Sequence, residues 1–128
     1  MHAEREIGLY IHVPLCRQRC HFCAFYLEIA TPARTEAFLS ALTHELSLYA
    51  RQHLFRQRAL RSIYFGGGTP TTIPARELAG LLARIQDAFP VSPDAEVTIE
   101  AHPSTVTSSD LSVLADAGFN RLSLGAES

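Results

Sequence analysis

Three cysteines lie close together near the start of the chain, and they are the residues best able to do chemistry. Cys16, Cys20 and Cys23 are all the cysteines of the 128-residue sequence and fall within eight positions. A disulfide would leave one sulfur unpaired, whereas three thiolates at these spacings can surround one compact metal centre. An iron–sulfur cube has four irons, so a three-cysteine segment leaves one iron open to another ligand. The spacing therefore predicts a 4Fe4S cluster with a vacant coordination position.

Two other kinds of site use cysteines at such spacings. Zinc could be held by the three thiolates together with the imidazole of His12 or His21, since both histidines lie close by. Structural zinc sites, however, usually place their ligands as two separated pairs. Cys20 and Cys23 also have the spacing of a redox-active pair, although this gives Cys16 no role. A zinc-stapled binding module therefore stays as the alternative from another class of protein.

The residues around the cysteines resemble those of the radical S-adenosylmethionine superfamily. Residues 8–16 read Gly-Leu-Tyr-Ile-His-Val-Pro-Leu-Cys, and the aromatic Phe22 directly precedes the third cysteine. Within the superfamily the sequence is similar to the oxygen-independent coproporphyrinogen III oxidases and the related haem chaperones. The resemblance implies that the cluster binds S-adenosylmethionine and cleaves it to methionine and a 5'-deoxyadenosyl radical. It also implies a tetrapyrrole as the other small-molecule partner and a separate electron donor protein.

A run of three glycines follows a short apolar segment, and residues 66–70 read Gly-Gly-Gly-Thr-Pro. Glycines let the backbone approach a ligand and present its N–H groups with no side chain in the way. A tight turn ahead of the proline is the alternative. The run resembles the family's GGGTP signature, which implies that the backbone of Gly67, Gly68 and Thr69 contacts the methionine end of the cofactor. Gly66 is expected to serve the turn.

A carboxylate stands at the expected tip of a later apolar strand. Glu100 has two acceptor oxygens that could hold both hydroxyls of a ribose, and a solvated carboxylate at the rim is the alternative. Residues 100–103, Glu-Ala-His-Pro, match the family's segment with an acid at this position. The resemblance implies further cofactor contacts for Tyr10 near the cluster, for Phe22 beside the adenine and for Glu127 beyond the last strand.

Two positions depart from the pattern of the oxidases in this branch. The oxidases typically have a fourth cysteine two residues after the third, where this chain has Phe25, and the family usually has glutamine in place of Glu127. The haem chaperones of the branch lack the fourth cysteine, as do some methyltransferases that use two S-adenosylmethionine molecules. The sequence therefore favours a haem chaperone that also binds haem, with an oxidase or a radical methyltransferase as alternatives.

The elements that must position these residues alternate between strand and helix. Hydrophobic periodicity predicts strands over residues 7–13, 62–65, 96–100 and 120–125 and helices over 35–51, 76–89 and 107–117. Thr35 is expected to cap the first helix and Ser108 or Ser109 the third, with Gly118 ending it. Right-handed crossovers then give a parallel sheet whose loops after the strands share one edge, where ligands bind.

The expected fold is therefore α/β, a parallel (β/α) partial barrel of the radical S-adenosylmethionine type with its first three to four β/α units. Residues 1–128 are expected to be the N-terminal part of such a core domain, incomplete at the C-terminus. A net charge of −2 and scattered arginines argue against a nucleic-acid partner. The sequence has no apolar run of about 18 residues that could span a membrane. Free cysteines at metal-ligand spacing fit a reducing compartment, because such thiols would oxidise in a secreted protein, and the protein is therefore expected in the cytoplasm.

Overall fold

A four-stranded parallel sheet forms the centre of the computed structural model, which describes residues 6–16 and 28–125. The strands are β1 (Ile7–Val13), β4 (Leu60–Gly67), β5 (Val91–Ala101) and β6 (Arg121–Leu124), and they pair in this order. Every pair is parallel, so neighbouring strands are joined by crossover segments. This arrangement confirms the expected α/β fold with a partial-barrel sheet.

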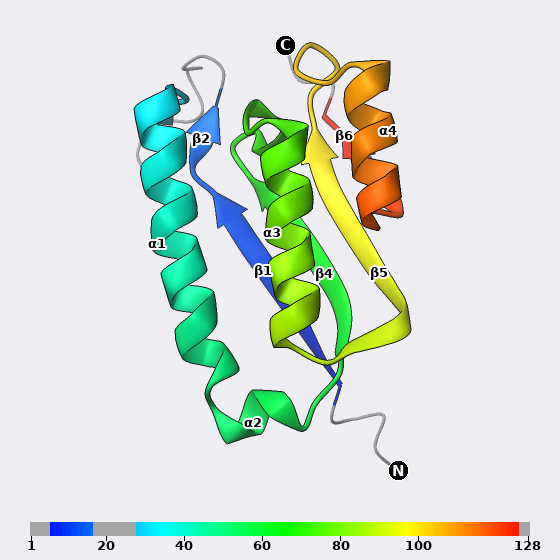
Figure 1. Ribbon diagram of the computed structural model, residues 1–128. Helices are drawn as coiled ribbons and strands as arrows, with labels where there is room; N and C mark the ends of the chain where they lie inside the picture. The colour runs from blue at the N-terminus through cyan, green and yellow to red at the C-terminus, as the bar shows by residue number, and fades with distance from the viewer. Residues whose placement is uncertain (1–5, 17–27, 126–128) are drawn as a thin grey trace.

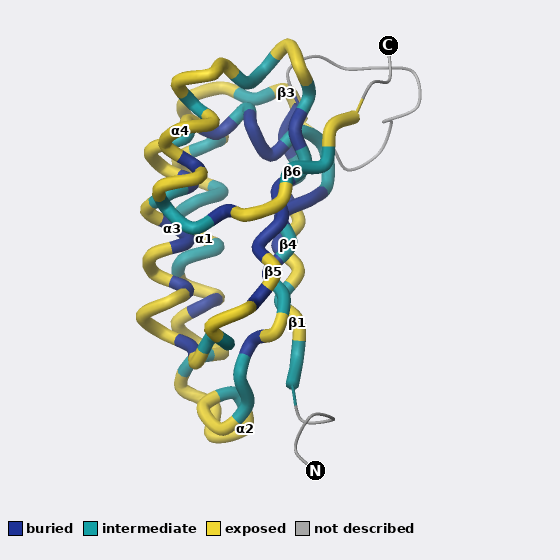
Figure 2. Tube along the Cα trace, turned by 90° about the vertical axis from the view of Figure 1, so that its right-hand side faces the viewer, coloured by how far each residue is buried: buried dark blue, intermediate teal, exposed yellow. Residues whose placement is uncertain are grey.

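The crossover helices all cover the same face of the sheet, as Figures 1 and 2 show from two directions. These helices are α1 (Pro32–Ala50), α3 (Ala75–Ala88) and α4 (Ser108–Ala117), and the short α2 (His53–Arg56) follows α1. We call the opposite side the open face. Its residues along the strands include Tyr10 and His12 of β1, Tyr64 and Gly66 of β4, and Glu100 of β5.

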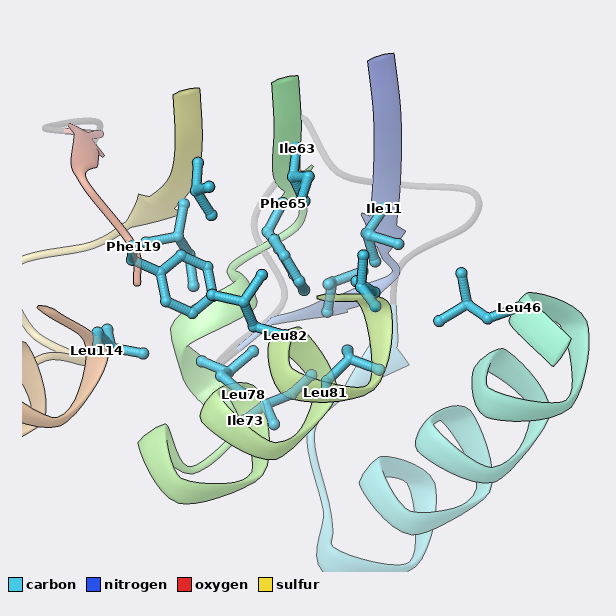
Figure 3. Packing of buried hydrophobic residues seen from close by; sticks show 14 of the residues in the cluster. Ile11, Leu46, Ile63, Phe65, Ile73, Leu78, Leu81, Leu82, Leu114 and Phe119 are labelled. Carbon is cyan, nitrogen blue, oxygen red and sulfur yellow. The ribbon is translucent and has the colours of Figure 1, made fainter. Parts of the chain in front are cut away.

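The hydrophobic core lies between the sheet and the helices (Figure 3). Alternate strand residues supply one half of it, because successive side chains of a strand point to opposite faces. Leu78, Leu82 and Ile85 of α3 are fully buried against them. Phe65 of β4 meets Phe119 edge-on, with ring centroids 5.2 Å apart. The remaining buried strand side chains of this layer include Ile11, Val13, Ile63, Val97 and Ile99.

Two helix caps differ from the sequence prediction. Helix α1 begins three residues before Thr35, because the side chain of Thr31 accepts a hydrogen bond from Arg34 N at 3.1 Å and Pro32 suits the first turn. Helix α4 is capped by Thr107 and not by the serines that follow it. Thr107 and Asp110 exchange side chain-to-backbone hydrogen bonds of 3.0 Å, which forms a capping box. The expected end of α4 at Gly118 is confirmed, with φ of 123°.

A second, two-stranded parallel sheet lies beside the main one and was not expected. It pairs β2 (Leu15–Cys16) with β3 (Glu28–Ile29). Backbone hydrogen bonds run from Glu28 N to Pro14 O at 2.9 Å and from Ala30 N to Cys16 O at 2.8 Å. Two-residue strands are too short to produce a hydrophobic period, so sequence patterns miss them.

Parallel pairing brings the carboxyl ends of the strands to one edge of the sheet, the upper edge in Figure 1. The second sheet follows β1 at this edge, the 3-10 turn Pro70–Thr72 follows β4, and residues 102–107 follow β5. Within the described ranges, no helix is both long and apolar enough to cross a membrane.

Candidate functional site

Glu100 occupies the end of β5 on the open face and is held at both of its carboxylate oxygens. The Tyr64 hydroxyl donates to Oε2 at 2.6 Å, and the backbone N–H of Gly67 donates to Oε1 at 3.2 Å. The side chain is half-buried. Since an ionised carboxylate offers about four lone-pair directions, two hydrogen bonds leave it able to accept further donors.

Tyr10 lies next to this pair on β1, opposite Tyr64 in the sheet register. The two rings stack with centroids 5.8 Å apart, and the Tyr10 hydroxyl is 3.4 Å from Nδ1 of His12. Tyr10 is 57% exposed, so most of its ring is accessible on the open face. The open face therefore presents an accessible aromatic surface beside the carboxylate.

Glu100 also changes the acidity of both tyrosines. Its hydrogen bond to Tyr64, then burial and its negative charge, raise the pKa of Tyr64 above 10.0, while Ser123 and Arg121 act in the lowering direction. For Tyr10, partial burial and then the charge of Glu100 raise the pKa above the same value. Both phenols are therefore kept protonated, and the Tyr64 hydroxyl stays a donor.

The glycine run performs several structural tasks. Gly66 lies within β4, not in a turn as expected, and a Cβ there would sit 2.9 Å from the Tyr64 ring, 3.0 Å from the Tyr10 hydroxyl and 3.1 Å from Glu100 Oε1. Gly67 has φ of 114°, and its Cβ would meet the Val13 carbonyl at 2.5 Å. Gly66 thus leaves space for three side chains, and Gly67 allows close approach to β1.

The backbone N–H groups of Gly67, Gly68 and Thr69 donate hydrogen bonds to other residues of the protein. Gly67 N donates to Glu100, Gly68 N to the Val13 carbonyl at 2.8 Å and Thr69 N to the Leu15 carbonyl at 2.7 Å. These bonds fix the segment against β1 and β2. A ligand that contacts the run through the backbone would therefore use its carbonyl oxygens.

The cysteine prediction is only partly within the described residues. Cys16 ends β2, is buried, and has its thiol 3.6 Å from the carbonyl oxygen of Glu28. Cys20, Cys23 and Phe22 lie outside the described residues, as does Glu127. In residues 6–16 and 28–125 there is no group of three or more potential metal ligands. Because only one of the three cysteines is described, the binding of a cluster by Cys16, Cys20 and Cys23 stays a prediction.

Tyr64 is the residue of this site that the sequence analysis did not select. Its strand was correctly expected, but the alternation of Ser62, Tyr64 and Gly66 with the apolar Ile63 and Phe65 was not used. That period of two places Tyr64 on the polar face of its strand, the same face as Glu100. The alternation was the signal that could have identified it.

Comparison with known proteins identifies the same family that the cysteine and glycine motifs resemble. The model of the radical SAM superfamily matches residues 10–128. The anaerobilin synthase of Escherichia coli O157:H7 is 32% identical over 126 residues, which cover 98% of this chain and 28% of that protein. The heme chaperone HemW of Mycobacterium tuberculosis is 37% identical over 129 residues, covering 97% of this chain and 32% of the relative.

The fold is also that of a solved member of the family. The structure of coproporphyrinogen III oxidase (HemN) from Escherichia coli, described as a radical SAM enzyme, matches with a TM-score of 0.87 and 32% identity. The match covers 96% of this chain and 28% of that one. The chain thus spans about a third or less of the length of these relatives. A family match over almost the whole sequence, supported by the fold, shows that this chain belongs to the radical SAM superfamily.

Proposed function

We propose that the protein is a radical S-adenosylmethionine enzyme of haem and porphyrin metabolism that acts as a haem chaperone. The superfamily implies a 4Fe4S cluster and S-adenosylmethionine. The observation that carries the S-adenosylmethionine part of the proposal is Glu100, an acceptor held by Tyr64 and Gly67 at the edge of the sheet to which the glycine run also belongs. In this proposal residues 1–128 are the N-terminal part of a radical S-adenosylmethionine core domain that continues beyond them.

The proposed cluster ligands are Cys16, Cys20 and Cys23. Their thiols suit an iron–sulfur cluster, and Cys16 stands at the sheet edge where β2 ends. When bound and reduced, the cluster supplies the electron that breaks the sulfonium bond of S-adenosylmethionine. The protein would therefore need an electron donor protein. Free cysteines at metal-ligand spacing fit a reducing compartment, and we propose the cytoplasm.

The open face supplies the proposed S-adenosylmethionine site. The lone pairs of Glu100 that remain would accept the two ribose hydroxyls, and the methionine amino group, a donor, would bind carbonyl oxygens of Gly67, Gly68 or Thr69. Tyr10 would line the site near the cluster. Phe22 beside the adenine and Glu127 after β6 complete the proposed set. The missing side chain of Gly66 supports this assignment, since any Cβ would crowd Glu100 and the tyrosines.

The choice of haem chaperone rests on two sequence positions. Phe25 stands where the oxidases of this branch typically have a fourth cysteine, and Glu127 stands in place of a usual glutamine. An ionised carboxylate accepts hydrogen bonds but cannot donate them, so Glu127 would handle a second cofactor molecule differently from glutamine. A coproporphyrinogen III oxidase remains the second candidate, because HemN matches in fold and sequence.

Anaerobic reconstitution of the full-length protein tests the cluster. We expect about four irons and four sulfides per chain, and loss of most of the cluster when Cys16, Cys20 or Cys23 is changed to Ala. Stoichiometric zinc without capacity for iron would instead favour the zinc-stapled binding module.

An anaerobic assay with a purified reductant tests the choice between chaperone and oxidase. We expect the full-length protein to bind haem and to cleave S-adenosylmethionine slowly, leaving coproporphyrinogen III unchanged. Mass spectrometry would detect conversion to protoporphyrinogen IX as two decarboxylations. Their appearance would assign the protein to the oxidases.

A further inference from the structure

Glu100 can serve a ribose only if its oxygens point in a fixed direction, and the structure contains a device that fixes them. The 2.6 Å bond from the Tyr64 hydroxyl has the length of a charge-assisted hydrogen bond, which is stronger than a neutral one. The Gly67 N–H holds the other oxygen. Two bonds to different oxygens prevent the carboxylate from rotating about its terminal torsion, which is otherwise soft.

The surroundings of Tyr64 keep this clamp in place. Tyr10 stacks on one side of its ring, and the absent side chain of Gly66 leaves space where Tyr10, Tyr64 and Glu100 converge. Tyr64 and Glu100 come from adjacent strands, so the rigid ladder between β4 and β5 sets their separation. The clamp is therefore built into the sheet and does not depend on a loop.

We propose that Tyr64 is a positioning residue that orients Glu100 for recognition of both hydroxyls of the ribose of S-adenosylmethionine. This inference rests on the proposed function, because it needs the nucleoside at Glu100. Tyr64 itself would not touch the reacting atoms. Its effect is specificity for a ribonucleoside over a deoxyribonucleoside, since a carboxylate with fixed lone pairs loses a bonded partner when one hydroxyl is missing.

Binding of S-adenosylhomocysteine and of its 2'-deoxy analogue to the full-length protein tests the inference without catalytic turnover. Calorimetry on the wild-type protein should show tighter binding of the ribonucleoside. Tyr64→Phe, which keeps the ring and removes the hydroxyl, should weaken ribonucleoside binding about tenfold and leave the deoxy analogue much less affected. Tyr49→Phe is the matched control, since Tyr49 lies on α1 against Phe55, in the helix layer.

The outcomes separate the two proposals. Equal loss for both ligands, or no loss in Tyr64→Phe, would overturn the positioning role while leaving the nucleoside site intact. A wild-type protein that binds neither ligand would overturn the proposed function and with it this inference.

A second measurement detects the clamp without any ligand. The difference in phenolate absorbance between wild-type and Tyr64→Phe protein isolates the Tyr64 hydroxyl, which should titrate above pH 10.0. Glu100→Gln should bring that titration to lower pH, because the hydrogen bond to Glu100 is the largest cause of the shift. A Tyr64 titration that does not respond to Glu100→Gln would show that the clamp is absent in solution.

Discussion

At the scale of single residues, two adjacent glycines of the run, Gly66 and Gly67, are not equivalent. Gly66 is needed because other side chains converge on it, whereas Gly67 is needed for its own backbone conformation and its approach to β1. Gly80, in the middle of α3, is different again, since a Cβ there would meet no atom within 4 Å. The sequence indicates where each of these glycines lies, but only the surrounding atoms show what a side chain at each position would meet.

Gly67→Ala should destabilise the protein by about 1–3 kcal/mol, because an alanine strains the positive φ and its Cβ collides with the Val13 carbonyl. Gly80→Ala is the matched control and should stabilise by about 0.5–1 kcal/mol, since alanine suits a helix interior better than glycine. Thermal unfolding of the full-length protein measures both changes. An unchanged melting temperature for Gly67→Ala would contradict the described backbone.

The sequence can identify the residues of local motifs and the face on which Tyr64 lies, but it cannot identify the partner of Tyr64. The three cysteines, the glycine run and Glu100 stand in local motifs, so the resemblance to a family identifies them. Tyr64 acts through a partner 36 positions away, and this pairing exists only once β4 and β5 align. Positioning residues of this kind depend on register, which a local pattern does not contain.

At the scale of elements, strand and helix types followed from periodicity, but several boundaries did not. Strand β5 begins at Val91, five residues before its expected start, although Pro93 and Asp94 read as a turn. The register between β4 and β5 shifts near Leu60, and a proline is tolerated at such an irregularity. Because the pairing with β4 is irregular here, β5 extends through Pro93 and Asp94, two residues that disfavour a strand.

Thr107→Ala should weaken α4 by about 1 kcal/mol, because it removes the oxygen that accepts from Asp110 N. Ser109→Ala changes a residue in the first turn of the same helix and should have little effect or stabilise it slightly. Hydrogen exchange of residues 108–117 reports both variants locally. Faster exchange in Ser109→Ala than in Thr107→Ala would restore the serine as the cap.

At the scale of the whole molecule, one face of the sheet is packed and the other is open in the described part of the chain (Figure 2). Tyr10 on the open face and Leu124 on the edge strand β6 are each 57% exposed. An edge strand with exposed apolar side chains is a template for pairing with other chains.

The 128-residue chain alone should therefore associate as its concentration rises, which light scattering can follow. Leu124→Lys should reduce association by placing a charge on the edge strand. Leu48→Lys, at a 46% exposed position on α1, makes the same chemical change away from the sheet edge and should have less effect. A monomer that unfolds in one sharp transition would contradict this expectation.

The small sheet of β2 and β3 affects how much conformational entropy the chain would lose on binding a metal. Parallel pairing of Leu15 with Glu28 and of Cys16 with Ile29 holds together the two strands that flank residues 17–27. Joining the ends of such a segment carries an entropic cost that grows slowly with its length. Here the packing of the folded domain offsets the entropy lost in joining β2 to β3, whether or not a metal is bound. A metal bound by Cys16, Cys20 and Cys23 would therefore close only the short loops between these ligands, because the longer loop between β2 and β3 is already closed by the strand pairing.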